Sequence, residues 1–295
     1  MPVIALFGSL VSLTVGASFA KHLFPVLGAE GTTAYRAVFA AILLLAIWRP
    51  WRLPLSAKDA RTIVLYGAVT GLMNLLFYMS IARIPLGVAI AIEFTGPLAV
   101  AMAASRRALD FAWIGFAVLG MGLLLPLTEG SGTLDPVGVG FALGAAVCWA
   151  LYIVFGKRAG QIPGGQATSL GMLTAALVVL PFGVARAGTA LLDPALMLAG
   201  LGVGILSSAV PYSLEMVALK RLPKQTFGIL LSMEPAIGAL AALVILGEQL
   251  TLLQWLAIAS IIVASIGSAT SIQQALPKAR QRAERLAPDP PSNRC

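Results

Sequence analysis

Long apolar runs alternate with short breaks of polar, Gly and Pro residues along the 295-residue chain. A helix needs roughly 20 apolar residues, at about 1.5 Å each, to cross a hydrocarbon core about 30 Å thick. The pattern therefore predicts an all-α integral membrane protein with ten transmembrane helices. The expected helices are 3–22, 32–48, 62–81, 86–104, 111–127, 137–155, 166–184, 195–217, 225–246 and 251–271.

Lys and Arg residues are concentrated in alternate breaks between these runs. With a cytoplasmic N-terminus, 16 of the 20 cations fall in cytoplasmic segments and four fall outside. Cytoplasmic loops of membrane proteins carry such an excess, and moving the helix count by one would destroy it. The sequence thus predicts a multi-pass protein with both termini in the cytoplasm. The four outer cations are Lys21, Arg36, Arg83 and Arg186.

Prolines mark an internal repeat. Arg83-Ile84-Pro85 and Arg221-Leu222-Pro223 each separate two apolar runs, and twelve residues after each comes a mid-helix proline, Pro97 or Pro235. Five helices is an odd number, so the second half should enter the bilayer from the opposite side, as in secondary transporters with inverted repeats. A duplicated scaffold without transport is the open alternative. The expected parts are a first repeat at 1–130, a second at 131–271 and a disordered cytoplasmic tail at 272–295.

Composition excludes other classes of protein. Apolar residues make up 59% of the chain and charged residues 11%, which is too little charge to cover a soluble protein of this length. The net charge of +8 lies in short clusters between the apolar runs, so its expected partner is an anionic lipid bilayer and not nucleic acid.

The sequence holds no arrangement of side chains typical of catalysis or metal binding. Every Asp falls in a loop, a helix end or the tail, and His22 is the single histidine. Cys148 lies in an apolar run and Cys295 is the last residue. A zinc site and the phosphate-binding loop of ATPases are both missing. We therefore expect a protein that is not an enzyme and holds no metal or cofactor.

Depth in the membrane singles out two carboxylates. Glu93 follows Arg83 by ten residues and Glu234 follows Lys224 by ten, which is about 15 Å of helix, or half the hydrocarbon core. Both lie close to a proline that should kink the helix, Pro97 or Pro235. An ionisable group at this depth is costly unless it faces a cavity or a partner. We expect the pair to bind a substrate amino group, to couple transport to protons, or both; helix packing by neutral carboxyl groups is the alternative.

Three further charges have open interpretations. Glu215 lies nearer the cytoplasmic end and is either a gate or part of an interfacial ion pair. Lys21 and Arg36 lie near the outer ends of the first and second expected helices. Snorkelling to the lipid headgroups is the first interpretation of Lys21. The alternative is that one of these two cations attracts a substrate carboxylate.

Polar and aromatic residues on the expected helices are candidates for a cavity wall. Asn74 and Tyr78 on the third helix match Tyr212, near Ser207 and Ser208, on the eighth. Such groups either line a cavity or join helices by hydrogen bonds, which is the commoner use. Trp149 and Tyr152 lie three residues apart on one face of the sixth helix and are either packing residues or cavity wall.

Two glycine pairs have the spacing that lets helices approach closely. These are Gly67 with Gly71 and Gly140 with Gly144. Their expected role is structural.

Several stretches resemble the drug/metabolite transporter superfamily, specifically its EamA-type members that export threonine and homoserine. They are FPVLG (24–28), PWRL (50–53), PLGVAIAIEFTGPLAV (85–100), SRR (105–107), PYSLEM (211–216) and SMEPA (232–236). The resemblance covers nearly the whole chain. It implies export of small amino acids across a bacterial inner membrane, in antiport with protons; a broader exporter of other amino acids, purines or toxic compounds is the alternative. A second copy of the chain is a further candidate partner.

Overall fold

The computed structural model describes residues 2–103, 134–162, 165–211, 214, 233–264 and 266–267, with seven residues scattered between 112 and 123. All regular structure in this part of the chain is helical, as predicted. The elements are α1 (Pro2–Lys21), α2 (Phe24–Trp48), η1 (Pro50–Arg52), α3 (Ala57–Ile81), α4 (Leu86–Glu93), α5 (Thr95–Ala103), α7 (Pro136–Ala159), α8 (Gln166–Ala187), η2 (Gly188–Leu192), α9 (Pro194–Gly204), η3 (Ile205–Ala209), α12 (Glu234–Ala241) and η4 (Ala242–Leu246).

Five of the described helices are long and apolar enough to cross a membrane. They are Val3–Lys21, Phe24–Arg52, Ala57–Ile81, Pro136–Gly156 and Gln166–Leu192, built on α1, α2 with η1, α3, α7 and α8 with η2. Shorter apolar helices span Leu86–Val100, Pro194–Ala209, Glu234–Leu246 and Leu252–Ala264. The expected helix at 111–127 and the first part of that at 225–246 lie largely outside the described residues.

The second helix is longer than its apolar pattern predicted. We expected it to begin at residue 32, but α2 begins at Phe24. Gly28 interrupts it with φ of +70°, a left-handed conformation that glycine adopts without strain, and the helix then resumes. The break therefore bends the helix and does not end it, which moves Arg36 from an expected helix end to the middle of α2.

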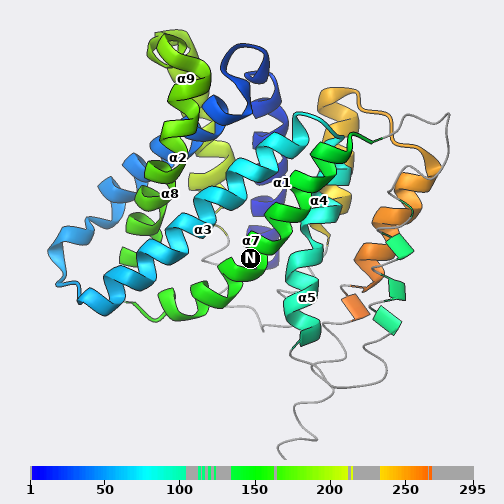
Figure 1. Ribbon diagram of the computed structural model, residues 1–295, viewed down its shortest axis with the longest axis horizontal. Coiled ribbons are helices and arrows are strands. Elements are labelled where there is room, and N and C mark those ends of the chain that lie inside the picture. The colour runs from blue at the N-terminus through cyan, green and yellow to red at the C-terminus, as the bar shows by residue number, and fades with distance from the viewer. Residues whose placement is uncertain are drawn as a thin grey trace, which may run out of the picture.

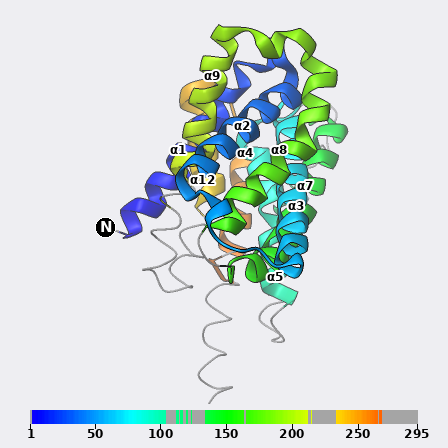
Figure 2. The ribbon, with the colours of Figure 1, turned by 90° about the vertical axis from the view of Figure 1, so that its left-hand side faces the viewer.

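The helices form a bundle with the long elements side by side. α3 runs along α7 on one flank and along α8 on the other, and α2 packs against α8 (Figure 1). Figure 2, turned by 90°, shows α1 and α12 on one side of the bundle and α3 and α7 on the other.

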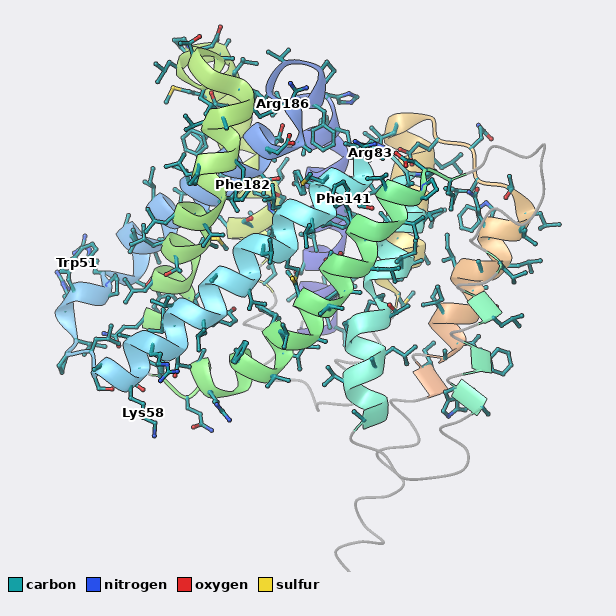
Figure 3. The ribbon with its side chains drawn as sticks, viewed as in Figure 1. Trp51, Lys58, Arg83, Phe141, Phe182 and Arg186 are labelled. Carbon is teal, nitrogen blue, oxygen red and sulfur yellow. The ribbon has the colours of Figure 1, made fainter. Side chains whose placement is uncertain are left out.

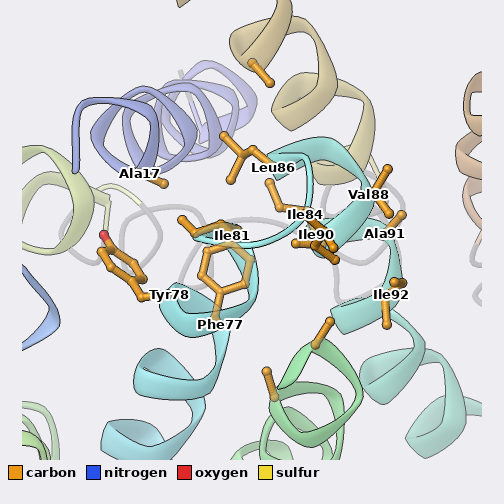
Figure 4. Packing of buried hydrophobic residues seen from close by; sticks show 14 of the residues in the cluster. Ala17, Phe77, Tyr78, Ile81, Ile84, Leu86, Val88, Ile90, Ala91 and Ile92 are labelled. Carbon is orange, nitrogen blue, oxygen red and sulfur yellow. The ribbon is translucent and has the colours of Figure 1, made fainter. Parts of the chain in front are cut away.

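The largest cluster of buried apolar side chains surrounds the turn between α3 and α4. Phe77 and Ile81 at the end of α3 meet Leu86 and Ile90 of α4 and Ala17 of α1 (Figure 4). Every residue of α4 is buried, which agrees with its almost continuous apolar sequence. This cluster closes the interior of the bundle at the end where α3 finishes.

Exposed charges lie at the two ends of the long helices. Figure 3 shows Trp51 and Lys58 at one end of α3 and Arg83 and Arg186 at the opposite end. The long helix bodies between these ends are apolar. This distribution is the one expected of spans whose ends reach the two surfaces of a membrane.

One of the two glycine pairs brings helices into close contact. A methyl group added at Gly67 would overlap the carbonyl oxygen of Gly171 in α8, and one added at Gly71 would lie 2.7 Å from that of Ala175. Gly140 differs, because no described atom lies within 4 Å of such a methyl group. A methyl group added at Gly144 would lie 3.1 Å from Leu76 Cδ1 of α3, so the expectation of close approach is confirmed for Gly67, Gly71 and Gly144 and wrong for Gly140.

This difference gives a paired stability test. Gly67→Ala should lower the free energy of unfolding by roughly 1–3 kcal/mol because α3 and α8 must move apart. Gly140→Ala on α7 should change it by less than about 1 kcal/mol. Thermal unfolding in detergent, followed by labelling of the buried Cys148 thiol in a Cys295→Ser background, measures both. Equal stability of the two variants would contradict the packing described.

Candidate functional site

A cavity of about 460 Å³ lies inside the bundle and collects most of the polar residues singled out in the sequence. Its wall is formed by α1, α2, α3, α4, α7, α8, η3 and α12. Six of the predicted site residues line it: Arg36, Asn74, Glu93, Trp149, Tyr152 and Glu234. They come from five separate helices, so the folded bundle brings them together.

The two glutamates meet because α4 and α12 cross closely. A methyl group added at Gly87 would lie 2.7 Å from Cα of Ala239, so the two backbones touch there. Glu93 lies six residues beyond this crossing on α4, and Glu234 lies five residues before it on α12. Each of these distances along the helix is about 8–9 Å, so both side chains reach the same cavity. Each glutamate is only 7% exposed.

Both glutamates lie at helix ends, Glu93 at the end of α4 and Glu234 at the start of α12. The helix that begins at Leu86 is interrupted at Phe94, directly after Glu93, and continues as α5. Pro97 has no N–H to donate to the carbonyl oxygen of Glu93, as residue 97 of a regular helix would. Pro235 lies in the first turn of α12, next to Glu234. Pro97 thus leaves the Glu93 carbonyl without a helical donor, whereas Pro235 occupies a first-turn position where no intrahelical bond is lost.

Arg36 is a buried cation held in one orientation by neutral acceptors. Its Nε donates to Ser208 Oγ at 2.9 Å, Nη1 to Asn74 Oδ1 at 2.7 Å and Nη2 to the Ser207 carbonyl at 2.9 Å. The guanidinium carbon also lies 5.4 Å from the centre of the Tyr78 ring. Arg36 is 6% exposed, and none of the described carboxylates forms an ion pair with it. Two of its five N–H groups remain for another acceptor.

A local change in helix geometry supplies two of these acceptors. η3 is a π-helical turn at residues 205–209, where the wider coil shifts backbone hydrogen bonds. It packs on α1 so closely that a methyl group added at Gly16 would lie 2.7 Å from the Ser207 nitrogen. Ser9 of α1 donates to the Pro211 carbonyl at 2.9 Å. The serines of this segment therefore join helices and also hold Arg36.

Aromatic side chains complete the wall. Trp149 contacts Phe94 edge-to-face, with ring centres 5.5 Å apart. The hydroxyl of Tyr66 donates to that of Tyr152 at 3.1 Å, and their rings lie 5.0 Å apart. Tyr66 was not predicted, because a single Tyr in an apolar run carries no local signal of a cavity.

Two predicted residues lie away from the cavity. Tyr78 is fully buried, packs against Phe24 and Phe77, and has no hydrogen-bond partner for its hydroxyl in the described part of the chain. Lys21 is not among the residues that line the cavity, and its ammonium group pairs with the carboxylate of Glu248. Glu215 and Tyr212 lie outside the described residues.

The cavity combines opposite charges in an apolar enclosure. Arg36, Glu93 and Glu234 lie near enough to interact electrostatically. A ligand with one cationic and one anionic group could satisfy both kinds of charge at once.

Comparison with known proteins identifies close relatives. Residues 136–270 match the EamA-like transporter family. The chain is 47% identical over 274 residues to proteins of Escherichia coli K12 and Salmonella typhimurium LT2, each named threonine/homoserine exporter RhtA. Each match spans 93% of this chain and 93% of the relative. An uncharacterized transporter of Clostridium kluyveri is 30% identical over 149 residues, 49% of this chain and 47% of that protein.

A solved crystal structure of another protein shares the fold. It is 18% identical in sequence, covers 92% of this chain and 98% of its own, and superposes with a TM-score of 0.59.

Proposed function

The chain belongs to the EamA-like transporter family, and from that premise we propose that it exports threonine, homoserine and similar small amino acids across the bacterial inner membrane. The curated relatives that match over 93% of the chain carry this activity in their names, which supports the substrate. The observation that carries the proposal is the cavity, where a fixed guanidinium faces two carboxylates.

The proposed binding mode uses both charges of an amino-acid zwitterion. The substrate carboxylate accepts the two remaining N–H groups of Arg36, since planar guanidinium matches carboxylate geometry. The ammonium group lies against Glu93 or Glu234. The apolar and aromatic wall surrounds a short side chain.

We further propose that one of these carboxyl groups carries the coupling proton. With both glutamates ionised, Arg36 balances only one of them. Binding a proton at one carboxyl group neutralises the empty cavity, and a substrate ammonium group competes for the same place. Exchange of proton for substrate then follows from charge balance at a shared site.

The proposed architecture is two inverted five-helix repeats, at 1–130 and 131–271, with both termini and the tail at 272–295 in the cytoplasm. The charges at the helix ends support this orientation. Among described residues, the end of the bundle near Trp51 carries the exposed cations Arg49, Arg52, Lys58, Arg61 and Arg158. In the same described part of the chain, the other end carries three cations against four carboxylates, as expected for the outer side: Lys21, Arg83 and Arg186 against Glu30, Asp135, Asp193 and Glu248.

Reconstituted protein tests the function directly. Proteoliposomes loaded with labelled threonine should exchange it for external threonine or homoserine, and an imposed pH gradient should drive net flux. Threonine methyl ester, which lacks a carboxylate, should compete at least about tenfold less well. Absence of flux from correctly folded protein would disprove the substrate assignment, and flux that ignores the pH gradient would disprove proton coupling.

A broader exporter is the second candidate. The favouring observation is a volume of about 460 Å³ with aromatic walls, which is roomy for threonine. Competition by purines or large apolar amino acids at concentrations similar to those of threonine would favour this candidate. Exclusion of those compounds would favour the narrow one.

A further inference from the structure

One carboxylate outside the cavity connects three separate elements at a single end of the bundle. Glu248 pairs with Lys21, the last residue of α1, through one carboxylate oxygen. Its other oxygen accepts the backbone N–H of Leu86, the first residue of α4, at 2.9 Å. Glu248 itself follows η4. The three elements are far apart in the sequence, and Glu248 links them by polar contacts.

The local sequence explains the position of Glu248. Gly247 has φ of +66° and ends the helix in the left-handed conformation that favours glycine. The N–H of Glu248 then donates to the Ala242 carbonyl at 3.2 Å, which folds the chain back over the helix end. A carboxylate placed there can accept the free N–H at the start of α4, where the helix dipole favours negative charge.

The interior is sealed on this side of the bundle. Ala20, next to Lys21, Leu86, which donates to Glu248, and Ile81 are completely buried in one cluster. Along α1, the cavity wall reaches Ala17 and goes no further toward Lys21. In the opposite direction, the wall extends to Gly160 at the end of α7 and Thr168 at the start of α8. The cavity therefore runs toward one end and is closed at the other.

We propose that Lys21, Glu248 and the Leu86 amide form the gate that closes the cavity at the end opposite its mouth. The proposal rests on the transport function proposed above, because a transporter must open that end to release its load. In the observed state the carboxylate holds α1, α4 and the loop after η4 together. Release requires both of its contacts to break, since each ties a different helix to the same loop.

The other ion pair at this end is unlike the gate. Arg83 Nη1 donates to Asp135 Oδ2 at 2.8 Å, and the two side chains are 48% and 31% exposed, against 20% and 17% for Lys21 and Glu248. The guanidinium holds the pKa of Asp135 below its usual value. This pair joins the turn after α3 to the start of α7, two helices already packed along their length. Asp135 is therefore a matched control.

Thiol labelling tests the gate without any assumption about substrate. Ala17→Cys, in a Cys148→Ser, Cys295→Ser background, places a reporter one turn beneath Lys21. Thr168→Cys marks the side of the membrane that holds the mouth. An impermeant maleimide is applied from each side, using intact cells and inverted vesicles, and the labelling rate of position 17 is measured from the side opposite the mouth.

Opening the gate should expose the reporter. Glu248→Ala should raise its labelling rate about fivefold or more, as expected for loss of a partly buried ion pair and a helix cap. Glu248→Gln and Lys21→Gln should give smaller increases. In both variants the side chain at position 248 can still accept the Leu86 N–H, and only the ion pair is lost. Asp135→Asn should leave the rate unchanged. Unchanged labelling in every folded Glu248 and Lys21 variant, or an equal increase in Asp135→Asn, would overturn the proposal.

Cross-linking tests the opposite change, in which the gate is locked shut. Joining the thiols of a Lys21→Cys, Glu248→Cys double variant with a cleavable bifunctional reagent should stop export and leave substrate binding intact, and cleavage should restore export. Continued export from fully cross-linked protein would show that this end need not open. If threonine is not transported at all, the proposed function fails, and the labelling experiment still decides the gate.

Discussion

Glu93→Gln is expected to reduce export driven by a proton gradient to roughly 1% or less of the unmodified rate, while the protein still folds and reaches the membrane. The amide keeps the size of the side chain but can neither hold a coupling proton nor offset an ammonium charge. Glu93 lines the cavity and is only 7% exposed, so the charge is lost at the place where the substrate is proposed to bind. Flux into proteoliposomes and thermal unfolding of the same preparation are measured together.

Exchange without a gradient separates the two roles of Glu93. Retained threonine counterflow with lost gradient-driven flux assigns it to the proton, and loss of both assigns it to substrate binding as well. Glu30→Gln is the matched control, because Glu30 lies near the start of α2 and does not line the cavity. Normal gradient-driven export by Glu93→Gln would mean that the carboxylate is structural.

Replacement of Arg36 should damage both stability and binding. Arg36→Met removes three hydrogen bonds and leaves the Asn74 oxygen and the Ser207 carbonyl without their donor. Loss of one member of such a buried charged network costs about 3 kcal/mol of unfolding free energy. Export of threonine should fall below detection in the same variant.

Arg36→Lys distinguishes a structural role from a substrate contact. The ammonium group keeps the charge and some stability but lacks the planar fork, so the half-saturating threonine concentration should rise about tenfold or more. The same variant should discriminate less between threonine and its methyl ester. Arg186→Met, at an exposed position away from the cavity, is the control. Unchanged affinity and unchanged discrimination in Arg36→Lys would contradict the proposed carboxylate contact.

Hydropathy and helix geometry predicted much of the site. The ten-residue spacing from a charged helix end placed Glu93 and Glu234 deep in the bundle, and both line the cavity. Asn74, Trp149 and Tyr152 followed from polar or aromatic residues on otherwise apolar helices. The rise of a helix fixes depth, and polar groups in an apolar interior need a partner or a cavity, which is why these residues meet at one cavity; their roles stay predictions.

Predictions from the sequence failed where one local sequence is compatible with two backbone structures. The expected break before residue 32 contains Gly28, whose positive φ bends a helix that continues, so Arg36 lies in the middle of α2 and not near its end. Glu248 was missed for another reason. Its partners Lys21 and Leu86 lie 227 and 162 residues away, so no window along the chain could reveal them.

The contacts of Arg36 have a mechanical consequence. Its guanidinium joins α2 to Asn74 of α3 on one side and to the π-helical turn at Ser207 and Ser208 on the other. These contacts lie at mid-depth, whereas Glu248 and Lys21 lie at one end. When helices rotate slightly about contacts fixed at mid-depth, the two ends of the bundle move in opposite directions. The bound molecule lies near these contacts and therefore moves much less than the ends. In the proposed cycle, the substrate stays almost still while the protein moves around it.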